Sequence, residues 1–271
     1  MARVPAIIAG ALAGMLPSLA AAPSLAADGL FKNVACEGTY PKHLQGVCTN
    51  DKDSIFWSFT DVLAKTSLEG RMVRKVPVAD HHGDLCHQDG KLYVAVNLGK
   101  FNDASEKAAD SWVYVYDAES LAEIARHQTP EVVYGAGGIG HHAGRFIVVG
   151  GLPPAVGENY AYEYDPQFKF VRRHTINSGY TLMGIQTAAY SAGSWWFGCY
   201  GKPETLLKTD EAFRLQGRYT FNCSLGIVGL ADGGFLVAQG ASAPGKGHTG
   251  SLLLADADAK KGLVIREKRS R

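Results

Sequence analysis

The chain has 271 residues, and its 27 Lys and Arg nearly balance its 26 Asp and Glu, for a formal net charge of +1. This balance argues against a nucleic-acid-binding surface, because such surfaces are strongly basic. The chain contains 32 glycines, well above the roughly 7% of average proteins, which predicts many tight turns between short strands in one large all-β domain.

The first 27 residues are typical of a secretory signal. Arg3 gives a short positive start, residues 6–15 are apolar, and small residues precede Asp28. A membrane anchor is the alternative, but the apolar run is short and is flanked by Pro5 and Pro17. We therefore expect residues 28–271 to form a single domain that is secreted or periplasmic and has no membrane span after signal removal.

Five cysteines in an exported protein predict disulfide bonds and one unpaired thiol. Cys36 and Cys48 could close a short N-terminal loop, and Cys199 and Cys223 could pair with each other, which would leave Cys86. The chain has no CxxC motif, so a structural zinc site is not expected.

Four kinds of segment recur five times in a fixed order from residue 44 onward. The first kind is rich in small residues and suits a crowded inner strand: 44–49, 82–87, 137–142, 185–190 and 225–230. A tight turn leads to a strongly β-forming run: 55–59, 92–96, 146–150, 195–199 and 235–239. The third kind ends in Asp or Ser: 62–67, 112–117, 161–165, 206–210 and 252–256. The fourth kind is more polar, like an edge strand: 72–78, 122–129, 170–176, 215–221 and 263–270.

The terminal polar residues of the third segments are spaced 45 to 50 residues apart. Four strands in about 45 residues, repeated around an axis, indicate a propeller. A β-sandwich is the alternative, but it would not give five copies of the same turns in the same order. The sequence therefore predicts an all-β fold, a five-bladed β-propeller with four antiparallel strands per blade. We expect residues 30–43 to supply a strand that pairs with the last blade and closes the ring.

The connections between these strands differ in length in a regular way. Those from the second to the third strand vary widely, at 97–110, 150–159 and 240–250. Those from the outer strand to the next inner strand also vary, at 39–43, 79–82, 130–136, 177–183 and 222–224. In an up-and-down blade both sets emerge on the same face. Because binding sites concentrate in variable loops on a rigid scaffold, we expect function on this face.

The densest cluster of titratable residues is His81, His82, Asp84 and His87. Adjacent strand residues point to opposite sides, so only one of the first two histidines should face the channel. His82 and Asp84 are candidates for an acid/base pair, and the cluster could bind a metal ion in the central channel. The alternative is that the histidines bond neighbouring blades. His141 and His142 precede a short turn, so we expect them on the opposite face in a structural role.

Four other candidates for ligand binding lie in the variable connections. Asn97 and Lys100 belong to the 97–110 connection, and Tyr134 and Tyr180 lie in loops where their rings could stack on a sugar or another ring.

Two inner segments resemble those of a known family. Residues 44–47, Leu-Gln-Gly-Val, are similar to the opening Thr-Gln-Gly-Leu of the bacterial and plant-type glutamine cyclotransferases, or glutaminyl cyclases. Residues 82–85, His-Gly-Asp-Leu, look like the Phe-Gly-Glu-Gly of that family. The resemblance implies a five-bladed propeller with Gln45 and Asp84 at the central pocket.

A third segment stands where that family has Asn-Glu-Leu-Glu. It reads Met-Gly-Ile-Gln at residues 183–186 and lacks both acids. Gln186 of this segment is a candidate for ligand binding. The leading hypothesis is an exported propeller that binds a small polar ligand, a sugar or a peptide end. The alternatives are an enzyme of hydrolase, lyase or cyclase type that uses Asp84 and His82, and a protein-interaction scaffold with a filled, flat channel mouth.

Overall fold

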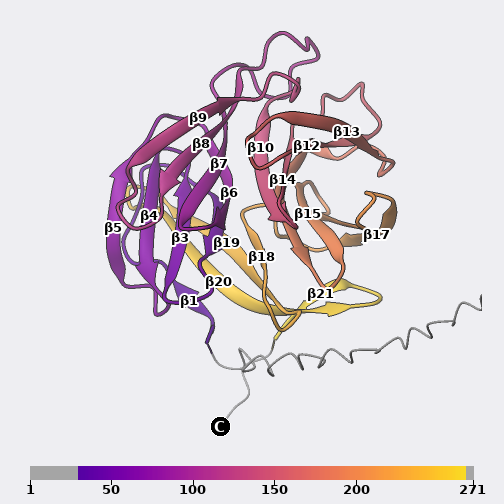
Figure 1. Cartoon of the computed structure of the whole chain (residues 1–271). Coiled ribbons are helices and arrows are strands. Elements are labelled where there is room, and N and C mark those ends of the chain that lie inside the picture. Colours follow the sequence, from indigo (N-terminus) through magenta and orange to yellow (C-terminus); the bar gives the residue numbers. More distant parts are fainter. Residues whose placement is uncertain (1–29, 267–271) are drawn as a thin grey trace, which may run out of the picture.

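The computed structural model describes residues 30–266, which form five antiparallel sheets around a ring (Figure 1). The predicted five-bladed β-propeller is confirmed. The predicted signal segment, residues 1–27, lies outside the described residues. Among the described residues, none forms a helix of the length and apolar character that crossing a membrane requires.

Blades 1 to 4 each contain four strands that pair in chain order, from the axis outward. Blade 1 consists of β2 (Leu44–Thr49), β3 (Ser54–Phe59), β4 (Val62–Ser67) and β5 (Met72–Pro77). Blade 2 consists of β6 (His82–Gln88), β7 (Lys91–Asn97), β8 (Ser111–Asp117) and β9 (Glu123–Gln128). Blade 3 consists of β10 (Ala136–His142), β11 (Arg145–Gly150), β12 (Asn159–Tyr164) and β13 (Phe170–Ile176). Blade 4 consists of β14 (Leu182–Ser191), β15 (Ser194–Tyr200), β16 (Thr205–Thr209) and β17 (Leu215–Thr220).

Blade 5 is completed by both ends of the described chain. Its inner strands are β18 (Ile227–Gly229), β19 (Phe235–Ala243) and β20 (Gly247–Asp258). The outer edge of β20 pairs with β1 (Val34–Ala35) along one part and with β21 (Gly262–Ile265) along the other. The prediction that the segment 30–43 closes the ring is therefore confirmed.

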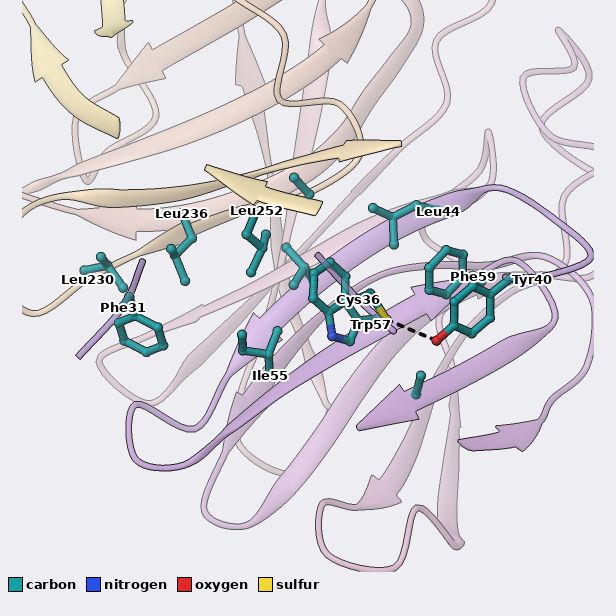
Figure 2. Close-up of a cluster of buried hydrophobic side chains, with 13 residues drawn as sticks. Phe31, Cys36, Tyr40, Leu44, Ile55, Trp57, Phe59, Leu230, Leu236 and Leu252 are labelled. Atoms are coloured by element: carbon teal, nitrogen blue, oxygen red, sulfur yellow. Dashed lines mark hydrogen bonds between the residues drawn. The ribbon is translucent and has the colours of Figure 1, made fainter. Parts of the chain in front are cut away.

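A cluster of buried side chains seals this closure between blades 1 and 5 (Figure 2). Trp57 and Phe59 from β3 pack in the same cluster as Leu236 and Leu252 of blade 5. The ring of Tyr40, from the N-terminal segment, stacks on Phe59 at a centroid distance of 3.6 Å. Burial of aromatic surface on this scale is a main source of stability for a blade interface.

The turns between inner and second strands are as tight as the sequence predicts in three of the blades. In blades 2, 3 and 4 they have two residues, both with positive φ, as in 89–90, 143–144 and 192–193. This is the type I′ geometry, whose twist matches that of the strands it joins. The non-glycine residues Ala143 and Ala192 adopt φ values of 49° and 50° there.

The predicted connection 240–250 is wrong. Strands β19 and β20 continue through it, with Gly240 paired to Gly250 and Ser242 to His248, and only residues 244–246 connect them. The small residues of this segment are typical of a loop, but strands pair through backbone hydrogen bonds, which need no large side chains. An additional bridge from Tyr40 to His248 widens the sheet at this point.

The predicted disulfide bonds are not formed, since all five cysteines are free in the described part of the chain. The Cys36 sulfur lies 3.0 Å from the Tyr40 hydroxyl in the cluster between blades 5 and 1, whereas Cys48 packs between blades 1 and 2. Cys199 and Cys223 are also buried, and burial raises the pKa of the Cys199 thiol to about 12.

Candidate functional site

A cavity of about 630 Å³ opens where the variable loops meet the central channel, and we call it the central cavity. Its apolar lining comes mainly from Phe101, Leu182, Met183 and Leu225, and its polar lining from His43, Gln45, His81, Gln186 and Tyr200. Most of these residues lie at the start of inner strands or in the connections that precede them, whereas Phe101 lies in the connection from β7 to β8 and Tyr200 ends β15. The cavity therefore lies on the face that the loop lengths predicted.

The structure brings together part of the predicted site. Five of the predicted residues line the central cavity: Gln45, His81, His82, Asn97 and Gln186. Four others do not: Asp84, Lys100, Tyr134 and Tyr180. Whether any of the nine binds or transforms a ligand stays a prediction.

Gln45 and Gln186 each keep half of their amide free of the protein hydrogen bonds that hold them. The Tyr200 hydroxyl donates to Gln45 Oε1 at 3.3 Å, which leaves Gln45 Nε2 as a donor. Gln186 Nε2 donates to the carbonyl of Met183 at 2.7 Å, which leaves Gln186 Oε1 as an acceptor. The cavity thus offers one oriented donor and one oriented acceptor, both uncharged.

Asn97 uses its amide to shape a loop. Its Nδ2 donates to the carbonyl of Gly99 at 3.0 Å, and its Oδ1 accepts from the backbone N–H of Asp110 at 3.0 Å. Asn97 therefore fixes the ends of the connection 98–110. Phe101 of this connection lines the cavity, packed so closely that a Cβ added at Gly135 would lie 2.6 Å from its ring.

Phe101 was missed from the sequence, although it is the single aromatic residue in that polar connection. Lys100, its predicted neighbour, has a side chain 78% exposed and lies 3.9 Å from Asp103. Tyr134 is buried and donates from its hydroxyl to Glu106 at 3.3 Å.

His81 occupies an unusual backbone position. It directly precedes inner strand β6 with a φ of 67°, and the residues that directly precede β10 and β18 are Gly135 and Gly226, with φ of 98° and 144°. A side chain in this left-handed region costs on the order of 1 kcal/mol. The imidazole is 59% exposed, and its Nε2 lies 3.6 Å from Asp80. Strain of this kind, retained at a cavity, is typical of functional positions.

Both ring nitrogens of His82 have protein partners. Its Nδ1 lies 2.7 Å from the carbonyl of Ala79, and its Nε2 lies 2.7 Å from the hydroxyl of Tyr116. A carbonyl only accepts, so Nδ1 donates and, in the neutral ring, Nε2 accepts from Tyr116. Burial lowers the pKa of His82 to about 4, which keeps the ring neutral at physiological pH.

Asp84 lies below the central cavity and spans the axis. Its Oδ1 accepts from the N–H of Val47 in blade 1 at 3.3 Å, and its Oδ2 accepts from the N–H of Ala188 in blade 4 at 3.2 Å. The residue is 1% exposed, and burial raises the pKa of its carboxyl well above the usual range. Gly46 makes room for it, since a Cβ there would lie 2.5 Å from Oδ1.

The other end of the channel holds a smaller cavity, of about 170 Å³, which we call the rear cavity. Cys86, His87 and His141 line it, together with Tyr190. The expectation that His141 and His142 lie on the short-turn face is confirmed, and the His142 ring stacks on Tyr190 at a centroid distance of 3.4 Å. Within residues 30–266, no three His, Cys, Asp or Glu side chains are grouped so that they could hold a metal ion.

No protein-family model matches the chain, and no curated protein matches it. Among solved structures it is similar to a xylan β-1,4-xylosidase from Bacillus halodurans C-125, with a TM-score of 0.59 and 13% identity over 86% of this chain and 56% of that chain. A protein of unknown function from Bacteroides caccae gives a TM-score of 0.49 at 14% identity, over 87% of this chain and 94% of that one. The Neurospora crassa Pan2 WD40 domain gives 0.42 at 12% identity, over 77% and 62%.

This chain spans about half the length of the xylosidase. At 13% identity the similarity shows the shared fold and nothing of activity. The chain is therefore a five-bladed β-propeller, with a cavity of ligand size at one end of its channel.

Proposed function

We propose that the central cavity binds one ring of an uncharged sugar. The observation that carries this proposal is the composition of the lining, which contains no Asp, Glu, Lys or Arg. The apolar wall of Phe101, Leu182 and Met183 suits the C–H face of a sugar ring. The free amide halves of Gln45 and Gln186 suit its hydroxyl groups.

Charge separates this proposal from binding of a peptide end. A free ammonium or carboxylate group loses much hydration energy in a cavity unless an opposite charge compensates it. The ionisable side chains in the lining are those of histidine and tyrosine, and burial lowers the pKa of His43 and of His82. The lining therefore favours a ligand without formal charge.

The same geometry supports binding rather than turnover. Glycoside hydrolysis ordinarily uses two carboxyl groups on either side of the bond, and none lines this cavity. Of the predicted acid/base pair, Asp84 is committed to two backbone N–H groups, and both His82 ring nitrogens have protein partners. The resemblance to glutamine cyclotransferases suggests peptides with an N-terminal glutamine as the second class of ligand to test.

The size of the cavity bears on the third hypothesis, a protein-interaction scaffold. That hypothesis expects a filled channel mouth, whereas a cavity of about 630 Å³ is within the range of small-molecule sites.

Calorimetric titration tests the proposal. Neutral monosaccharides, among them glucose, xylose, galactose and mannose, are titrated beside glutaminyl dipeptides. We expect at least one sugar to bind and Gln186→Leu to weaken its binding about fivefold, since one hydrogen bond to a neutral group contributes about 1 kcal/mol. Gln167→Leu, an exposed turn residue far from the cavity, is the matched control. Binding of dipeptides alone, or unchanged sugar affinity in Gln186→Leu, would contradict the proposal.

The proposal also places the protein outside the cytoplasm, on the basis of its N-terminal segment. The intact mass of the protein isolated from its own cells tests this, because signal removal predicts a chain that starts near Asp28.

A further inference from the structure

A third cavity, of about 480 Å³, adjoins the central cavity, and we call it the blade 4 groove. Leu182 and Tyr200 line both cavities. They are cross-strand partners at the loop-face ends of β14 and β15. The two cavities therefore share one boundary, formed by a single pair of side chains.

The blade 4 groove runs outward from the axis. Beyond Leu182 and Tyr200 its lining includes Thr205, at the start of β16, and residues 218–220, at the end of β17. It thus passes the ends of all four strands of blade 4. The connection between β15 and β16 covers only residues 201–204, whereas the equivalent connection of blade 2 covers 98–110. The connection of blade 4 is therefore much shorter than that of blade 2, and the two cavities adjoin at Leu182 and Tyr200 beside it.

The central cavity and the blade 4 groove differ in charge. The blade 4 groove is lined by Lys202 and Arg218, and by no Asp or Glu. Neither cation forms a salt bridge with a carboxylate within residues 30–266. Arg218 donates to the carbonyls of Ser178 at 2.6 Å and Tyr180 at 3.1 Å, which fixes the guanidinium in place without neutralising it.

The blade 4 groove also carries aromatic rings. Tyr180, Tyr200 and Tyr219 line it, and Tyr180 is 37% exposed with no hydrogen bond from its hydroxyl to another described residue. An exposed ring held by a fixed loop loses little conformational entropy when a flat ligand stacks on it. Tyr180 offers such a ring for a cyclic unit to stack on, and Tyr200 and Tyr219 contribute half-buried rings to the lining.

We propose that the ligand is an oligosaccharide that places one neutral unit in the central cavity and its following units in the blade 4 groove. The carboxylate of an acidic sugar in the groove is recognised by Lys202 and Arg218. This inference rests on the proposed sugar-binding function and adds chain length and acidity to it.

The test titrates cello-, xylo- and manno-oligosaccharides of one to six units, and the same chains with one carboxylate at either end. We expect affinity to rise at least tenfold between one and four units, and to rise further with the carboxylate at low salt. Tyr180→Ala should lower the affinity for tetrasaccharides about tenfold and leave monosaccharide affinity unchanged. Lys202→Gln should weaken only the acidic chains, and Lys246→Gln, an exposed lysine that lines neither cavity, should change nothing.

The monosaccharide arm separates the two proposals. Equal affinity for all chain lengths would contradict the proposal for the blade 4 groove and leave the proposal for the central cavity standing. The same holds if the variants change the affinity for one unit and for four units alike. If no sugar of any length binds, the proposed function fails and the groove inference fails with it.

Discussion

The two ends of the central channel are built from the same five inner strands and differ in almost everything else. At the rear, two-residue type I′ turns close three of the five hairpins and leave a cavity of about 170 Å³. At the front, long connections and strained positions such as His81 surround a cavity of about 630 Å³. Most of the rear is thus closed by two-residue turns, and the front contains the long, irregular connections in which binding sites concentrate.

Asp84 separates these two ends, and its removal should have the largest effect. Asp84→Ala leaves the N–H groups of Val47 and Ala188 unpaired in a buried place. We expect a loss of roughly 3–5 kcal/mol in the free energy of unfolding, measured by denaturant titration. Asp84→Asn keeps one acceptor and should lose about half as much.

If Asp84→Ala is as stable as the wild type, the hydrogen bonds of Asp84 across the channel do not stabilise the fold. If Asp84→Asn keeps its stability but abolishes turnover of some substrate, the enzymatic alternative is correct and the residue acts on a ligand.

His82 should make the front end sensitive to acid. Its pKa of about 4 in the folded protein lies below the ordinary value of about 6.5. The unfolded chain therefore binds the proton first, so stability is complete above about pH 6.5 and falls as the pH drops toward 4. The contribution over this window is about 3 kcal/mol, and denaturant titrations at pH 7 and pH 4.5 measure it.

His82→Gln is the reference for this prediction. It removes the titrating group, so its stability should fall less steeply between the two pH values than that of the wild type. Equal slopes would show that other groups, such as His43 or His87, whose pKa values are also lowered, produce the acid sensitivity.

The smallest expected change in stability is at His81, where a substitution at the front of the channel can be compared directly with one at the rear. His81→Gly should raise the free energy of unfolding by about 1 kcal/mol, because glycine accepts the positive φ. Ala143→Gly relieves the same conformation at the rear and should stabilise to a similar extent. Calorimetry should find weaker sugar binding only for His81→Gly. Equal binding by both variants would show that His81 does not contribute to sugar binding.

The strands could be predicted because their signals are local. Segments 44–49 and 62–67 coincide with β2 and β4, since alternation and turn residues act over a few positions. Gln45 and Gln186 were found through the family resemblance of their segments, and His81 through its cluster of titratable residues. All three line the central cavity, because each lies at or near the start of an inner strand.

The rest of the site depends on how loops fold on themselves, which the repeat does not encode. The connection 98–110 bonds to itself, from Leu98 N–H to the Asp110 carbonyl and from Lys100 N–H to the Ala108 carbonyl. That pairing accompanies an inward Phe101 and an exposed Lys100. Leu182 and Met183 resembled ordinary apolar residues, and only the closed ring brings them to the cavity.

The docking of β1 on β20 also sets the order in which the protein can mature. β1 has no partner until β20 has been synthesised, so Trp57 and Leu44 of blade 1 stay uncovered on their side of the closure until then. A chain halted after blade 4 would present this apolar surface to whatever it meets. Until blade 5 is complete, the growing chain is therefore an open arc rather than a ring.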